Sequence, residues 1–219
     1  MLVSDELRVG LARVAKHVDR VLVEDPYVKE EFILATDAPI NVEPVLPAHV
    51  PVRLAECVYL DLGTPIVISG TTSIWVTIPY ELRVVAGERV LKVLTPFKVK
   101  HTVVGTPYEG VICRWFKSTV ISNPNAWDGA EGLVKVVVRS PTPEVVKGIY
   151  ARLSILKLYV REGRHLSVFY GTMKGPVRDN VMYVSNVEEQ PPVEGLKEVH
   201  GLADHNVARY FHMEFMEGP

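Results

Sequence analysis

Alternation of apolar and polar side chains with a period of two residues is the strongest pattern in this sequence. It is clearest between residues 71 and 84, where every second position is apolar: Ile74, Val76, Ile78, Tyr80, Leu82 and Val84. Because successive side chains of a β-strand point to opposite faces of a sheet, this run predicts a strand with one face in a core. Pro79 has no backbone N–H to donate, which predicts a sheet edge or a bulge at that residue.

The same alternation recurs along the chain, for example at residues 52–62 and 134–138. Clusters of Gly, Pro, Ser and Asn separate the apolar runs, as turns do. Many short strands at this spacing predict an all-β protein, an antiparallel β-sandwich with little helix, built as two β lobes or as one compact unit. No long helical pattern alternates with the strands, which disfavours a doubly wound α/β fold.

The segment 122–131 is the best candidate for a domain boundary, because it is rich in Asn, Pro, Gly and Asp. It predicts an N-terminal β lobe at residues 1–122, an immunoglobulin-like β lobe at 132–190, and an acidic C-terminal tail at 191–219. Residues 1–20 fit a strand or a helix, and the β character of the rest favours a strand. Residues 204–215 fit a short helix.

Charge is unevenly distributed along a chain whose net charge is only −2. Residues 82–122 contain seven basic and two acidic residues, whereas residues 188–219 contain seven acidic and two basic ones. A basic segment can steer an anionic ligand towards itself. We therefore expect an anion-binding surface in the middle of the chain, which the acidic tail partly screens.

Features that indicate location favour the cytoplasm. No apolar run reaches the roughly 20 residues that cross a bilayer, and residues 1–20 lack the pattern of a signal peptide. The only cysteines, Cys57 and Cys113, lie in apolar strand-like runs. A reducing compartment predicts two buried free thiols, with a structural disulfide as the alternative. A single glutamine in the whole chain is typical of thermophile proteins.

No residues predict a metal, a cofactor or a catalytic centre. His200, Asp204, His205 and His212 are close in sequence. In a helix His205 and His212 would lie about 10 Å apart along the axis, too far to share a zinc ion. Phosphate-binding glycine motifs and a nucleophile motif are absent from the sequence. The protein is therefore expected to be non-catalytic.

The segment 105–118, with the sequence GTPYEGVICRWFKS, contains the best candidates for ligand binding. Arg114, Trp115 and Lys117 lie in a predicted strand, and Tyr108 lies in the turn before it. A guanidinium beside an indole can stack on or hydrogen-bond a planar or anionic ligand. The alternative is that Trp115 packs in the core while Arg114 and Lys117 reach water.

Three motifs carry a resemblance to a known family: Asn41-Val42-Glu43-Pro44, TIPYE at 77–81, and GVICRWFKS at 110–118. They resemble an archaeal family catalogued as domain of unknown function number 432. The resemblance covers about two thirds of the chain and is weak before residue 35 and after residue 190. It supports an all-β fold and implies no activity.

Three functions remain open at this stage. The favoured one is a non-catalytic β-sandwich module that binds an anionic ligand or a protein partner and self-associates as a homo-oligomer. A second is a small enzyme acting on an anionic substrate, with Arg114 and Lys117 as charge stabilisers. A third is a nucleic-acid-binding module that uses the basic middle of the chain.

Overall fold

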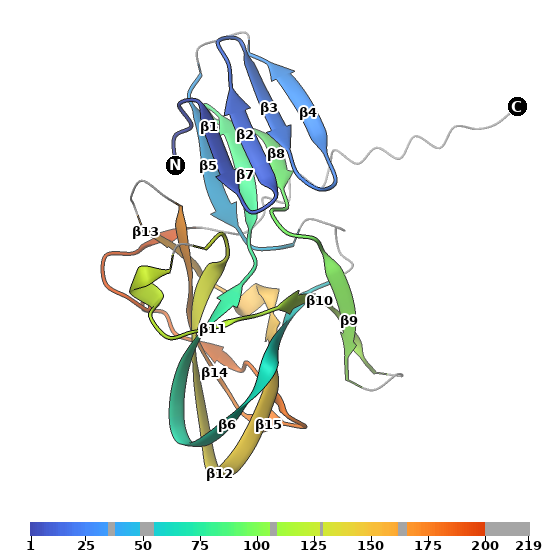
Figure 1. The fold of residues 1–219 in the computed structure, drawn as a ribbon, viewed down its shortest axis with the longest axis vertical. Helices are drawn as coiled ribbons and strands as arrows, with labels where there is room; N and C mark the ends of the chain where they lie inside the picture. Colours follow the sequence, from blue (N-terminus) through green and yellow to red (C-terminus); the bar gives the residue numbers. More distant parts are fainter. Residues whose placement is uncertain (35–37, 49–54, 106–108, 128, 162–165, 200–219) are drawn as a thin grey trace, which may run out of the picture.

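The computed structural model of the chain describes residues 1–34, 38–48, 55–105, 109–127, 129–161 and 166–199, which form three β-sheets (Figure 1). Strands account for 65% of these residues, and 3% lie in two short 3₁₀ helices, η1 (Pro124–Ala126) and η2 (Leu153–Ile155). The predicted all-β class is therefore confirmed. Neither of these described helices is long or apolar enough to cross a membrane.

The first sheet is an antiparallel meander of the N-terminal strands in the order β1–β2–β3–β4. Its strands are β1 (Glu6–Val9), β2 (Ala12–Lys16), β3 (Arg20–Glu24) and β4 (Lys29–Ile33). The segment for which both a helix and a strand were considered is thus strand, as favoured. Gly10 turns the chain between β1 and β2 with φ +54°, where a Cβ atom would also lie 2.7 Å from the carbonyl oxygen of Pro96.

The second sheet covers the first and completes a small sandwich in the upper part of Figure 1. It contains β5 (Ile40–Val45), β7 (Glu81–Ala86) and β8 (Arg89–Leu94) in that order, all antiparallel. Buried residues from both sheets, such as Val21 and Val23 on one side and Val42 and Val84 on the other, belong to one apolar cluster. Burial of these alternate positions holds the two sheets together.

The third and largest sheet is built on two long strands, β6 (Cys57–Ile78) and β12 (Gly132–Arg152). They pair antiparallel along most of their length and lie side by side in the lower part of Figure 1. The main path of this sheet runs β18–β13–β14–β12–β6–β10–β9. The added strands are β9 (Lys100–Val104), β10 (Val111–Lys117), β13 (Leu158–Arg161), β14 (Ser167–Gly175) and β18 (Lys197–Val199).

Four short strands complete the large sheet: β11 (Val120–Ile121), β15 (Val177–Arg178), β16 (Val181–Tyr183) and β17 (Asn186–Val187). Three of the pairings in this sheet are parallel, namely β10 with β6, β14 with β12 and β16 with β12. The sandwich-like fold therefore combines two antiparallel sheets with a mixed one.

The predicted strand over residues 71–84 is divided between two sheets. β6 ends at Ile78 in the large sheet, and β7 begins at Glu81 in the three-stranded sheet. Pro79 lies at the break, where its lack of an N–H costs no ladder hydrogen bond. The fully buried Tyr170 of β14 donates its phenolic hydrogen bond to the Pro79 carbonyl oxygen at 2.6 Å. The chain thus passes between sheets at a fixed, buried joint.

The domain division expected from the sequence stays a prediction. The two smaller sheets contain β1 to β5 together with β7 and β8, and the segment between β11 and β12 connects strands of the large sheet.

Replacing Tyr170 by phenylalanine should lower the free energy of unfolding by about 1–3 kcal/mol, because the buried Pro79 carbonyl would lose its donor. Urea denaturation followed by circular dichroism measures the change. Tyr183→Phe is the matched control, since the Tyr183 side chain is only half-buried and should change stability by less than about 0.5 kcal/mol. Equal stability of the wild type and the Tyr170 variant would contradict a supporting role for this hydrogen bond.

Candidate functional site

Arg114 points into the protein and is only 4% exposed. Its Nη1 lies 2.6 Å from Oε1 of Glu81, the first residue of β7, whose side chain is fully buried. Thr95 also places its hydroxyl 3.4 Å from the same carboxylate oxygen. Arg114 therefore links the large sheet to the three-stranded sheet at the joint beside Pro79.

Two buried tyrosines, Tyr80 and Tyr170, lie at this joint. Burial raises the pKa of Tyr170 well above its ordinary value, and the Glu81 carboxylate adds to the effect. Burial likewise raises the pKa of Tyr80. On the outer strand β9, burial and then the Arg114 guanidinium lower the pKa of His101. Both phenols thus stay neutral over the physiological pH range, and Tyr170 remains a donor to the Pro79 carbonyl.

Removing one member of the buried pair should be strongly destabilising, because the other charge would stay buried after this ion pair is lost. We expect Glu81→Gln to lower the free energy of unfolding by about 3–5 kcal/mol. Arg20→Ala is the control, since Arg20 and Glu31 form an exposed pair at 3.5 Å that should contribute about 0–1 kcal/mol. Similar losses in both variants, measured by chemical denaturation, would contradict this role of the pair.

Trp115 and Lys117 point to the opposite face of β10 from Arg114. Trp115 is half-buried and Lys117 is exposed. The ammonium group of Lys100 on β9 lies 5.1 Å from the centre of the Trp115 ring, a cation–π contact. Tyr108 lies outside the described residues. The structure thus separates Arg114 from the two other predicted ligand-binding residues that it describes.

Pairing between strands brings Trp115 into a row of aromatic residues. In the register of the large sheet Trp115 is paired with Tyr59 of β6, Tyr59 with Tyr150 of β12, and Tyr150 with Tyr183 of β16. All four side chains are half-buried, and none belongs to the two apolar clusters of the protein. We call these four residues the aromatic row. With strands about 4.8 Å apart, it spans about 14 Å.

The neighbours of the row along each strand show that it lies on the outer face of the sheet. Val58 and Leu60 on β6 and Ile149 and Ala151 on β12 are fully buried on the other face. Because side chains alternate between faces, the aromatic row points away from this core.

The Tyr59 side chain reaches over the neighbouring strand β12 at Gly148. A Cβ atom at Gly148 of β12 would overlap the Tyr59 ring, so the absence of a side chain at Gly148 makes room for it. Burial raises the pKa of Tyr59, with smaller contributions from Asp61 and Tyr183. The Tyr150 and Tyr183 rings follow with their centres 5.4 Å apart and their planes tilted by 47°. Neighbouring rings at this end of the row are therefore in contact but tilted relative to each other.

Cations surround the aromatic row on the same face. Lys100 is paired with Trp115 at one end, and the neighbouring positions on either side hold Lys117, Arg152 and Arg178. All four are exposed, and within the described part of the chain none of them forms a salt bridge. Asp61 is the one carboxylate among these described positions next to the row. These positions therefore combine aromatic rings with a net positive charge.

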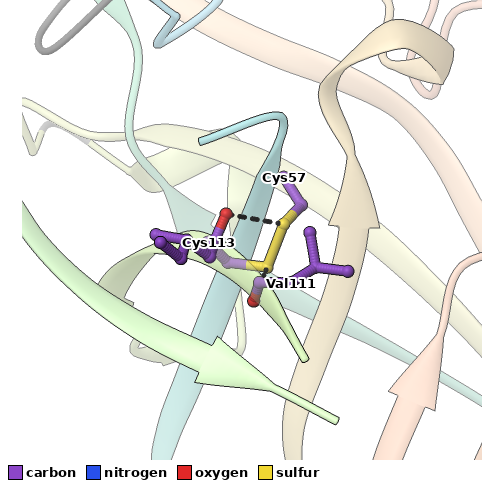
Figure 2. The surroundings of a disulfide bond; sticks show 4 residues. Cys57, Val111 and Cys113 are labelled. Carbon is purple, nitrogen blue, oxygen red and sulfur yellow. Dashed lines mark hydrogen bonds between the residues drawn. A yellow bond between two sulfur atoms is a disulfide. The ribbon is translucent and has the colours of Figure 1, made fainter. Parts of the chain in front are cut away.

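The two cysteines form a disulfide, and the prediction of free thiols is wrong (Figure 2). Cys57 of β6 and Cys113 of β10 are directly paired in the parallel register, with Cα atoms 4.7 Å apart, and both are buried, as expected. The sequence predicted each strand but not that the two strands are neighbours. The bond lies next to the Tyr59–Trp115 pair of the aromatic row.

Thiol titration tests the disulfide directly. Denatured, unreduced protein should show no reactive thiol, and reduction should release two. The Cys57→Ala/Cys113→Ala double variant should lose about 2–4 kcal/mol of stability, the usual contribution of a disulfide. Two thiols in the denatured protein without reductant would show that the bond does not form.

Tyr59, Tyr150 and Tyr183 were not among the residues predicted from the sequence. Each is one aromatic residue in an ordinary strand, and no spacing in the sequence relates them, since their proximity depends on strand pairing. The histidines near the C-terminus and the predicted helix at residues 204–215 lie outside the described residues. Within the described ranges no group of three or more His, Cys, Asp or Glu residues could hold a metal ion.

Fold and site together define an all-β protein with a mixed central sheet, whose outer face carries aromatic rings among cations. The chain matches the model of a family described as protein of unknown function (DUF432) over residues 4–216, and it belongs to this family. The match extends beyond the limits expected from the sequence motifs, at both ends of the chain. Comparison with curated proteins and with solved structures found no match.

Proposed function

We propose that this protein is a non-catalytic module that binds an anionic partner on the face of the large sheet that carries the aromatic row. The single observation that supports this most is the arrangement of Lys100, Lys117, Arg152 and Arg178 around the row on a solvent-facing surface. At the register positions next to the row these four exposed cations face a single carboxylate, Asp61, and their positive field attracts anions.

Of the residues predicted from the sequence, Trp115 and Lys117 belong to this face. Arg114 has a structural role in the proposal, because its side chain is buried against Glu81. This placement argues against the alternative in which Arg114 and Lys117 together stabilise charge on a substrate, since the two side chains point to opposite faces of β10.

Location and assembly are also part of the proposal. We keep the cytoplasm of a thermophile as the expected location, since intracellular disulfides are common in hyperthermophiles although rare in the cytosol of other cells. Self-association remains a prediction that sedimentation velocity can test.

Binding to heparin, a flexible polyanion, tests the proposed function. The Lys117→Glu/Arg152→Glu double variant should bind at least about tenfold more weakly than the wild type, which is about 1.4 kcal/mol, because two contacts become repulsive. The control is Lys29→Glu/Arg89→Glu, which reverses two exposed charges on the small sandwich and changes the net charge equally. Equal weakening in both double variants would show that only net charge matters and would contradict the proposal.

A further inference from the structure

We infer that the anionic partner is a single-stranded nucleic acid, whose bases stack on the aromatic row while its phosphates contact the surrounding cations. The inference rests on the proposed function and adds the chemical class of the ligand. It depends on the geometry of Trp115, Tyr59, Tyr150 and Tyr183, which the positive charge alone does not require.

The aromatic rings are placed as a stacking surface. The Tyr59 ring lies over Gly148, on the face of the sheet that points away from the core. The row crosses four adjacent strands with no aliphatic side chain between its members. Unpaired bases offer flat π faces of similar size, and stacking of a base on an aromatic side chain contributes about 1–3 kcal/mol.

The cations are placed to contact a backbone on both sides of such a strand of bases. Lys117 and Arg178 lie in the next row of positions towards one side, and Arg152 lies towards the other. Lys100 lies over the Trp115 ring, where it can exchange its cation–π contact for a phosphate when a base takes its place. Phosphate contacts of this kind are independent of base sequence, as the stacking is.

Two related ligands fit the same face less well. Bases in a duplex already stack on one another, so a duplex can use the cations but not the rings. A neutral polysaccharide can pack on aromatic rings but gains nothing from four exposed cations. The combination of rings and positive charge favours an unpaired, negatively charged chain.

The decisive measurement compares chains that carry the same charge with and without bases. Labelled oligothymidylate, oligouridylate and an abasic phosphate chain, each of about 12 units, cover the usual site sizes of such modules. Fluorescence anisotropy at low salt should show oligothymidylate or oligouridylate binding at least about tenfold more tightly than the abasic chain, as expected if one or more bases stack. Repeating the measurement with oligodeoxyuridylate, which differs from oligouridylate only in the sugar, identifies DNA or RNA as the preferred ligand.

Single substitutions test whether the tighter binding of chains with bases comes from the aromatic row. Trp115→Leu and Tyr150→Leu should remove most of the preference for bases and leave binding of the abasic chain unchanged. Tyr150→Phe keeps the ring and should keep the preference. Gly148→Ala should displace the Tyr59 ring and weaken base binding only. Tyr27→Leu removes an exposed aromatic side chain on the small sandwich and serves as the control. Thermal unfolding confirms that each variant is folded.

The possible failures are distinguishable. Equal affinity for the abasic chain and the oligonucleotides, with heparin binding still dependent on Lys117 and Arg152, would overturn this inference and leave the proposed function intact. Equal affinity for a duplex, or binding of a neutral polysaccharide that Trp115→Leu abolishes, would also overturn it. Absence of binding to heparin and to all oligonucleotides would overturn both.

Discussion

The antiparallel pairing of β6 with β12 is the interaction on which the rest of this structure depends. These strands are 22 and 21 residues long, and every other strand of the large sheet is added to them directly or through one or two neighbours. Their register decides which side chains share a face. It places Val58 and Leu60 with Ile149 and Ala151 in the core, and therefore Tyr59 with Tyr150 on the outside. A shift of one residue would bring the tyrosines into the core.

The same period of two explains why β10 serves two purposes. Arg114 points inward and pairs with Glu81 across the joint between the sheets, whereas Trp115 and Lys117 point to the outer face. An arginine buried against a carboxylate on another sheet fixes the relative position of the two sheets, because the pair is stable only when both charges stay together. The integrity of the joint and the surface proposed for binding thus depend on one short strand.

Prediction from the sequence was reliable where the signal is local. Alternation identified the all-β class and the buried positions from Val76 to Val84, because each strand carries its own pattern. The β character of the rest of the chain then favoured a strand at the N-terminus. Prediction failed where the answer depends on which strands are neighbours. The direct pairing of Cys57 with Cys113 and the alignment of Tyr59 with Tyr150 and Tyr183 follow from the topology of the large sheet. The burial of Arg114 likewise depends on Glu81, which lies in a different sheet.

The disulfide has a consequence for the proposed binding face. β10 is held on β6 by a parallel ladder of five paired residues, far fewer than the ladder between β6 and β12. Parallel pairing is slightly less stable per residue than antiparallel pairing. The Cys57–Cys113 bond joins these strands at the position next to Tyr59 and Trp115. Trp115 belongs to the row only while β10 stays in register with β6. The disulfide therefore stabilises the pairing that keeps Trp115 beside Tyr59.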